Sequence, residues 1–255
     1  MNVFSCRVVR TRTVTDSIFV LRFRSSELAS TIRAGQFLNI RVQEGSEPLL
    51  RRPFSVYRVE GEELEIIYSV IGRGTSELAQ KREGDLLDVL GPLGVPFTVG
   101  EESYDTALLV AGGLGIAPLP ILTRDILKER RSIRTFVGAR SKAYLVTDYL
   151  QDVHVATDDG SMGFHGTVVD MLKDNLARAQ FVRPKIFACG PTPMLRAVAS
   201  LARTLGIPCE VSLEGPMGCG VGICQGCPVE RAGEERAYAL MCKEGPVFDI
   251  STISL

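Results

Sequence analysis

Four cysteines near the C-terminal end of the sequence constrain this chain more than any other feature. Cys219, Cys224, Cys227 and Cys242 have the spacing C-x4-C-x2-C-x14-C, with glycines between the first three. Four thiolates at such spacing bind either a structural zinc ion or an iron–sulfur cluster. Zinc sites more often pair two C-x2-C knuckles, whereas C-x4-C-x2-C with a distant fourth cysteine is the plant-type ferredoxin spacing. The pattern therefore favours a 2Fe-2S cluster, in whose loop the glycines let backbone N–H groups point at the sulfurs.

The amino-acid composition of the whole chain excludes several classes of protein and of binding partner. The 255 residues include seven cysteines, an odd number that does not suit a disulfide framework. Lys and Arg number 29 against 30 Asp and Glu, which argues against a general nucleic-acid binder. The first residues lack the apolar core of a signal peptide, and glycines and prolines interrupt the longest apolar run, 107–122. We therefore expect a cytoplasmic protein with no membrane or nucleic-acid partner, in which Cys6 and Cys209 are packing residues.

Residues 1–98 are predicted to form an antiparallel β domain. Short runs rich in β-branched and aromatic residues are bounded by polar or glycine-containing stretches, and Gly61 marks a hairpin turn between two of them. The predicted strands are 18–23, 37–42, 54–59, 64–71 and 86–90, with a brief helix at 76–81. Several short strands with turns between them indicate a small barrel or sandwich.

After a stretch rich in Gly and Pro at 91–102, strands and helices alternate. The predicted strands are 107–111, 133–137, 153–156 and 185–188. Four helices are predicted: one that ends near residue 131, a short one near residue 144, and two at 168–177 and 194–205. This alternation predicts a parallel sheet with helices on both faces across residues 99–213. Residues 214–255 form a third, short, glycine-rich segment that holds the cysteine cluster. The expected fold class is α+β with several domains.

Two stretches of the β domain suit phosphate groups. Arg52-Pro53-Phe54-Ser55 offers a guanidinium to clamp a phosphate and an aromatic ring to pack on another ring. The stretch 72–76, Gly-Arg-Gly-Thr-Ser, opens the predicted short helix, whose free N–H groups suit a second phosphate. Each stretch alone is equally explained as a basic turn beside a core phenylalanine. Two anion sites on one domain favour a bound cofactor.

Three turns at the carboxyl ends of predicted strands indicate a nucleotide site, because open α/β sheets bind ligands at that edge. Gly112-Gly113-Leu114-Gly115 leads into a helix, with Pro118 where G-x-G-x-x-G has its third glycine. This turn alone is also compatible with a tight connection that binds nothing. Asp158-Asp159-Gly160 and Cys189-Gly190-Pro191 reach the same edge. Cys189 is there either buried filler or a neighbour of a nicotinamide ring. If they line the adenosine side, Asp158 and Asp159 would repel the 2′-phosphate of NADP, whereas Arg140 after the second predicted strand could attract it.

In this order the three segments resemble the ferredoxin reductase superfamily: a flavin barrel, a Rossmann-like nucleotide domain and a 2Fe-2S domain. Arg52-Pro53-Phe54-Ser55 is similar to the family's R-x-[YF]-S flavin motif. The resemblance implies that Arg52 holds the FAD pyrophosphate and that Ser55 lies near the reactive flavin nitrogen. It also assigns Tyr68-Ser69-Val70 and Gly74-Thr75 to FAD, and Gly112, Gly113, Gly115, Cys189, Gly190 and Pro191 to NAD(P).

Within that superfamily, three further stretches look like the electron-transfer subunit of type B dihydroorotate dehydrogenase: 219–227 (CGVGICQGC), 241–248 (MCKEGPVF) and 156–161 (ATDDGS). The resemblance implies a flavin and iron–sulfur oxidoreductase subunit of pyrimidine biosynthesis. It would pass electrons from a TIM-barrel catalytic subunit that carries FMN, through the cluster and FAD, to NAD+, in a heterotetramer. No general base is needed for this role, so neither histidine is expected to be catalytic.

Two alternatives stay open. Relatives in sulfhydrogenase and ferredoxin:NADP transhydrogenase complexes share the architecture, so the chain is alternatively an NAD(P)H:ferredoxin-type reductase subunit. Some of those relatives carry Asp at the first cluster position, and Cys219 therefore favours the pyrimidine branch. The second alternative is a nucleotide-binding module stapled by zinc, with no redox role.

Overall fold

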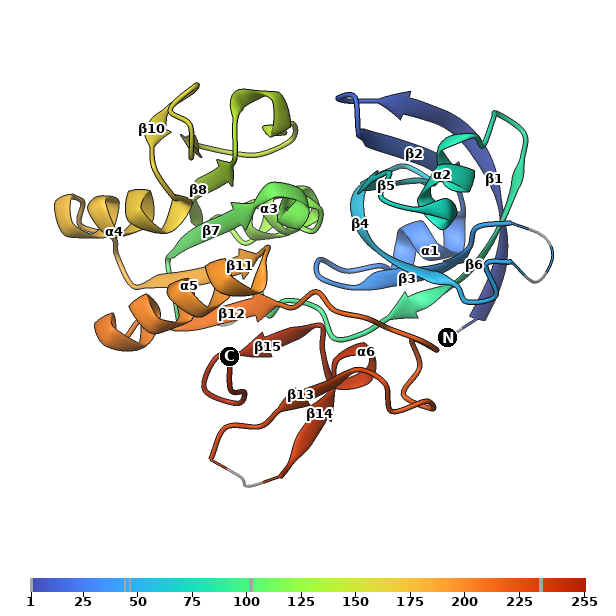
Figure 1. Cartoon of the computed structure of the whole chain (residues 1–255). Coiled ribbons are helices and arrows are strands. Elements are labelled where there is room, and N and C mark those ends of the chain that lie inside the picture. Colours follow the sequence, from blue (N-terminus) through green and yellow to red (C-terminus); the bar gives the residue numbers. More distant parts are fainter. Residues whose placement is uncertain (1, 44, 46, 101–102, 234–235) are drawn as a thin grey trace.

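Six strands of the N-terminal part close into an antiparallel barrel (Figure 1). The computed structural model describes residues 2–43, 45, 47–100, 103–233 and 236–255. The barrel strands are β1 (Asn2–Thr13), β2 (Ile18–Arg24), β3 (Phe37–Arg41), β4 (Arg52–Glu60), β5 (Glu63–Ser69) and β6 (Leu86–Leu93). Their order is β1-β2-β5-β4-β3-β6. The predicted barrel is confirmed; the sequence pattern did not indicate helix α1 (Ser26–Thr31).

Alternation along β2 and β5 shows why the barrel forms. Leu21, Phe23 and Ile66 are fully buried on one face, because successive side chains of a strand point to opposite sides. Arg22 and Glu65 lie on the other face, where they form an ion pair at 2.8 Å. Helix α2 (Arg73–Ala79) lies at one end of the barrel and begins at residue 73 rather than at 76 as predicted.

The second domain contains a seven-stranded sheet in the order β10-β9-β8-β7-β11-β12-β15. Its strands are β7 (Thr106–Gly112), β8 (Ser132–Ala139), β9 (Val153–Thr157), β10 (Phe164–His165), β11 (Pro184–Cys189), β12 (Cys209–Ser212) and β15 (Val247–Asp249). All neighbours are parallel except β12 and β15, which pair antiparallel. The parallel sheet predicted for residues 99–213 is confirmed. The antiparallel edge strand β15 is an addition to it that comes from the cysteine-bearing segment 214–255.

Helices cover both faces of this sheet, as predicted (Figure 1). Helix α3 (Leu119–Lys128) lies on the face toward the barrel, whereas α4 (Val168–Arg178) and α5 (Thr192–Leu205) pack together on the opposite face. Single turns of 3-10 helix follow β7 (η1, Gly113–Ile116) and β8 (η2, Lys142–Tyr144). Gly206 ends α5 in the left-handed conformation, with φ +64°, as predicted from its position after the last apolar residue.

The C-terminal segment packs against both other parts. After β12 comes the cysteine loop, followed by the hairpin β13 (Pro228–Glu230) and β14 (Tyr238–Leu240), helix α6 (Met241–Glu244) and β15. Phe37 of β3 and Leu93 of β6 belong to the same buried hydrophobic cluster as Cys227 and Phe248. The cysteine loop is thereby fixed against barrel strands β3 and β6.

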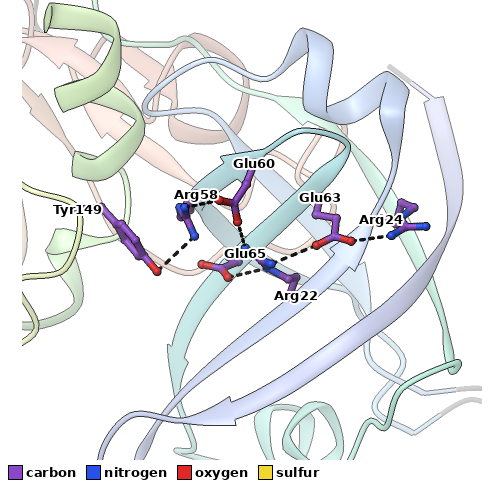
Figure 2. Close-up of polar contacts among 7 residues, drawn as sticks. All are labelled: Arg22, Arg24, Arg58, Glu60, Glu63, Glu65 and Tyr149. Carbon is purple, nitrogen blue, oxygen red and sulfur yellow. Dashed lines mark hydrogen bonds and ion pairs between the residues drawn. The ribbon is translucent and has the colours of Figure 1, made fainter.

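Charged side chains join the barrel to the second domain (Figure 2). Arg58 of β4 lies over the Tyr149 ring, 4.0 Å from its centroid, and donates to Tyr149 Oη at 3.2 Å. Its guanidinium also pairs with Glu60 at 2.8 Å, and Arg22 bonds to the same carboxylate. The contact fixes one domain against the other.

Among the described residues, no helix has the length and apolar character that crossing a bilayer requires.

Candidate functional site

The four cysteines of the C-terminal segment lie as two pairs. Cys227 and Cys242 are both buried, and their Sγ atoms are 3.3 Å apart. In the second pair, the Cys224 N–H donates to Cys219 Sγ at 3.4 Å. In the part of the chain that the structure describes, no three His, Cys, Asp or Glu side chains converge on one metal position. Two pairs of thiols suit a binuclear cluster, which takes two thiolates on each iron, better than one tetrahedral zinc.

Backbone N–H groups surround these sulfurs. Gly222 donates to Cys242 Sγ at 3.1 Å, Val221 donates to Cys219 Sγ at 3.4 Å, and Cys242 donates to Cys227 Sγ at 3.4 Å. Donors aimed at thiolate sulfurs orient the ligands and stabilise their negative charge. The sequence predicted such donors from the glycines of this loop, and the structure contains them.

The pKa values of two of the thiols follow from these surroundings. Hydrogen bonds from the N–H groups of Cys224 and Val221 lower the pKa of Cys219 to about 6. Burial, followed by the neighbouring Cys227, raises the pKa of Cys242 to about 12. A metal ion must therefore displace a proton from Cys242, as it does at thiolate sites in general. The paired sulfurs and their N–H donors fit a 2Fe-2S cluster.

The glycine turns after β7 and β11 contact each other at the carboxyl edge of the sheet. A Cβ atom at Gly115 would lie only 2.0 Å from the carbonyl oxygen of Cys189. Gly190, with φ +154°, packs in the same way against the backbone of Gly112. Gly113 is exposed and has φ +54°, with nothing within 4 Å of where its Cβ would be. The two turns therefore leave open backbone above them, which is what the approach of a pyrophosphate requires.

Cys189 is fully buried beneath this edge. Burial, with a smaller effect from the Glu214 carboxylate, raises the pKa of its thiol, and the Ser212 side chain hydrogen-bonds to it. Ser212 stands beside Cys189 in the pairing of β11 with β12. Neither Ser212 nor Glu214 lies in a sequence motif, so neither could be found from the pattern. Asp158 is exposed directly after β9, and its N–H donates to the Ala139 carbonyl oxygen at 3.1 Å.

The two predicted anion-binding stretches of the barrel adjoin each other. The Arg52 side chain lies against Gly74 of α2, where an added Cβ would be 3.2 Å from Arg52 Nε. Arg52 Nη1 donates to the Leu50 carbonyl oxygen at 2.7 Å. Gly74 therefore makes the room that this guanidinium occupies. Thr75 has a local role, since its Oγ1 accepts the Ile71 N–H at 3.0 Å at the start of α2.

Aromatic residues next to Arg52 line the same end of the barrel. Tyr68 packs edge-on against Phe54, with ring centroids 5.6 Å apart, and stacks on Phe19. Burial raises the pKa of Tyr68, whose hydroxyl has no hydrogen-bond partner within the described residues. An orphaned buried hydroxyl fits a bound cofactor that brings its own polar groups to the site. Ser55 is half-buried two residues after Pro53, and Ser69 and Val70 end β5 and follow it.

The three parts together define a protein of the ferredoxin reductase class. Its chain can be matched over 81% of its length to a ferredoxin reductase of carbazole 1,9a-dioxygenase, with a TM-score of 0.68 and 19% identity, a likeness of fold alone. A chain of the NADH-dependent reduced ferredoxin-NADP oxidoreductase is more similar, with a TM-score of 0.86 and 32% identity over 98% of this chain and 89% of that one.

Sequence comparison narrows the class to one family. The iron–sulfur cluster binding domain of dihydroorotate dehydrogenase B matches residues 214–254. The dihydroorotate dehydrogenase B (NAD(+)) electron transfer subunit of Bacillus pumilus is 37% identical over 97% of this chain and 96% of its own length. The same subunit of Geobacillus kaustophilus is 38% identical over 100% of this chain and 98% of its own length. The chain belongs to the family of dihydroorotate dehydrogenase B electron transfer subunits.

Proposed function

We propose that this chain carries electrons between a catalytic subunit that oxidises dihydroorotate and NAD+, with a 2Fe-2S cluster and FAD as its carriers, in pyrimidine biosynthesis. The observation that carries the proposal is the paired set of thiols. Three of the four sulfurs accept backbone N–H groups. Such a set has little use in a module that only binds nucleotides. The thiol set agrees with the family to which the chain belongs by similarity over nearly its whole length.

The residues proposed to hold the carriers follow from this reading. For the cluster they are Cys219, Cys224, Cys227 and Cys242. For FAD they are Arg52, Pro53, Phe54, Ser55, Tyr68, Ser69, Val70, Gly74 and Thr75, and for NAD they are Gly112, Gly113, Gly115, Asp158, Cys189, Gly190 and Pro191. The proposed domain limits are 1–98, 99–213 and 214–255. Supporting these limits, β6 ends at Leu93 and β7 begins at Thr106.

Each part of the chain has a physical task in this function. When bound, flavin supplies the exchange between a hydride and single electrons. Arg52 would neutralise the pyrophosphate charge, and the wall of Phe54 and Tyr68 would exclude water from the ring. The contact between Gly115 and Cys189 would let the nicotinamide nucleotide approach the sheet edge closely. No side chain has to donate or accept a proton in this scheme, so we assign no catalytic residue to this chain.

The function is tested on the full chain purified without oxygen. We expect a coloured protein whose spectrum and analysis give FAD, iron and inorganic sulfide. With NADH it should reduce an artificial acceptor, whereas alone it should not oxidise dihydroorotate, because the orotate-binding subunit is a separate chain. A colourless protein with one tightly held zinc and no iron would overturn the proposal. So would dihydroorotate oxidation by the purified chain alone.

We infer that the catalytic subunit docks beside the cysteine loop and that the complex is a heterotetramer. Electron transfer needs a short distance, and here Ile223 is 81% exposed beside the exposed Cys224. We expect Ile223→Glu to reduce co-purification with the catalytic subunit while the iron and flavin contents stay unchanged. The mass of the complex in solution tests the heterotetramer. Unchanged co-purification of the variant would exclude this surface.

The preference for NAD over NADP is assigned to Asp158. Its exposed carboxylate at the nucleotide edge would repel a 2′-phosphate. We expect Asp158→Asn to raise activity with NADPH relative to NADH by about fivefold, because removing one exposed like charge is worth about 1 kcal/mol. The measurement compares kcat/KM for both nucleotides in the wild type and the variant. An unchanged ratio would show that Asp158 does not face the ribose.

A second candidate function is favoured by one observation, the similarity to the NADH-dependent reduced ferredoxin-NADP oxidoreductase chain. In that case the chain would serve as a reductase subunit of a transhydrogenase or hydrogenase complex. The partner that co-purifies from the native cell decides between the two functions. An FMN-containing partner that oxidises dihydroorotate supports the first function, and a ferredoxin-oxidising or hydrogenase partner supports the second.

The cytoplasm is the proposed location. The supporting observation is that all seven cysteines are free thiols, four of which are needed as ligands. Thiol ligands are kept reduced in the cytosol, whereas an oxidising compartment favours disulfides. Fractionation of the native cell, followed with an antibody to the chain, tests the location.

A further inference from the structure

A side chain of the barrel, Asn39, hydrogen-bonds to the backbone of a cluster cysteine. Among the described residues, no other barrel side chain does so. The Nδ2 of Asn39 donates to the carbonyl oxygen of Cys219 at 3.1 Å, across 180 positions of sequence. The contact is close-packed as well as polar. Gly220, with φ +74°, lies against the same amide, and a Cβ there would be 2.5 Å from Asn39 Nδ2. The cysteine loop is thus seated directly on this side chain.

The strand that carries Asn39 pairs with β4, the strand that holds the proposed flavin motif. Asn39 of β3 stands opposite Pro53 of β4, and its neighbour Ile40 stands opposite Arg52. The carbonyl oxygen of Asn39 accepts Arg51 Nη1 at 3.3 Å, and the same nitrogen donates to the Asp88 carbonyl oxygen of β6 at 2.9 Å. The strands on either side of β3, β4 and β6, therefore hold Asn39 in place. A residue held in this way can transmit a fixed position from the flavin strand to the cysteine loop.

The amide is buried in a way that folding alone does not explain. Asn39 is 1% exposed, and its Oδ1 has no hydrogen-bond partner among the described residues. An unsatisfied buried polar atom destabilises a fold, and an apolar side chain of similar size would avoid that cost. Such residues concentrate where function requires them. The satisfied half of the amide is the half that contacts the cysteine loop.

We infer that Asn39 is a positioning residue for electron transfer: it fixes the cysteine loop on the flavin-bearing strand pair and so sets the separation of the two carriers. This inference rests on the proposed function. The amide touches neither the reacting atoms nor the substrate and acts through the Cys219 backbone. Loss of its donor should loosen the loop without removing any cluster ligand.

The test compares Asn39→Asp, which keeps the shape but lacks the donor, with Asn39→Ala. The matched control is Asn175→Asp, because Asn175 Nδ2 also donates to a backbone carbonyl oxygen, that of Met171 at 3.0 Å, in helix α4. Each full-length protein is analysed for iron, sulfide and FAD and is then mixed rapidly with NADH. Flavin reduction and cluster reduction are followed as separate phases. EPR spectra of the reduced cluster are recorded for each protein.

We expect flavin reduction by NADH to be unchanged in the Asn39 variants and cluster reduction to slow severalfold, because a loosened loop no longer holds the two carriers at one fixed separation. The EPR spectrum of the cluster should change, and the control should behave as wild type. A purely structural role would lower thermal stability and leave the second phase and the spectrum unaltered.

Three results would overturn the inference: a cluster phase and spectrum that match the wild type in both variants, equal slowing of both phases, or failure of both variants to fold, which would make Asn39 a folding residue. Failure of the proposed function looks different. In that case the wild-type chain itself would lack the cluster or the flavin, whatever residue stands at position 39.

Discussion

Cys242→Ala is expected to abolish iron and sulfide binding while the chain keeps FAD. Cys242 is buried beside Cys227, and the C-terminal segment 214–255 contains only four thiols, so no other side chain can replace it. The complex with the catalytic subunit should then lose dihydroorotate-dependent NAD+ reduction to background. NADH should still reduce an artificial acceptor that takes electrons from flavin. The thermal midpoint should fall, because a metal bound only by the folded state stabilises that state.

Cys209→Ala is the matched control for this substitution. Cys209 is also buried, at 1% exposure, but it lies in β12 and outside the paired thiols. Removing its sulfur should cost about 1 kcal/mol of stability and leave the iron, sulfide and flavin contents unchanged. Retention of a full complement of iron in Cys242→Ala would contradict the assignment. Loss of iron in both variants would indicate a general packing effect instead.

Features with a local chemical pattern could be predicted from the sequence. The spacing of Cys219, Cys224 and Cys227 specified a thiolate site, and the structure aims backbone N–H donors at the sulfurs of Cys219 and Cys227. The barrel strands followed from short runs rich in β-branched and aromatic residues, bounded by polar or glycine-containing stretches. The glycine turns containing Gly115 and Cys189 were expected at the same sheet edge, where the structure places them in contact. In each case the signal and the structural cause lie within a few residues of each other.

Features created by distant contacts could not be predicted in this way. Strand β15 (Val247–Asp249) has only three residues, and its pairing with β12 depends on how the cysteine loop folds back. Strand β12 is short and mixes Glu and Ser with apolar residues, so its pattern is weak. Asn39 has no motif around it, and its partner lies 180 positions away. Residues that join domains produce no periodic pattern in the sequence, because the role of each depends on a single contact with a distant residue.

Gly115→Ala is expected to remove the use of NADH and to destabilise the second domain. The new Cβ would lie 2.0 Å from the carbonyl oxygen of Cys189 and 2.6 Å from Gly190 Cα. Both contacts are with backbone, which cannot rotate away as a side chain can, so β7 and β11 would have to separate at their carboxyl ends. Overpacking of this kind typically costs 1–3 kcal/mol, about a factor of 5 to 150 in the folded population. The displaced turns would no longer present their backbone where the pyrophosphate is proposed to bind.

Gly100→Ala is the control, because its Cβ would have nothing within 4 Å and it lies outside the proposed sites. Thermal unfolding and kcat/KM for NADH with an artificial acceptor are measured for both variants and the wild type. Gly115→Ala should lose both stability and NADH-dependent reduction, whereas chemical reduction of the cluster by dithionite should persist, because the cysteine loop lies at a different part of the chain. Wild-type kcat/KM in Gly115→Ala would show that the nucleotide does not bind over this turn.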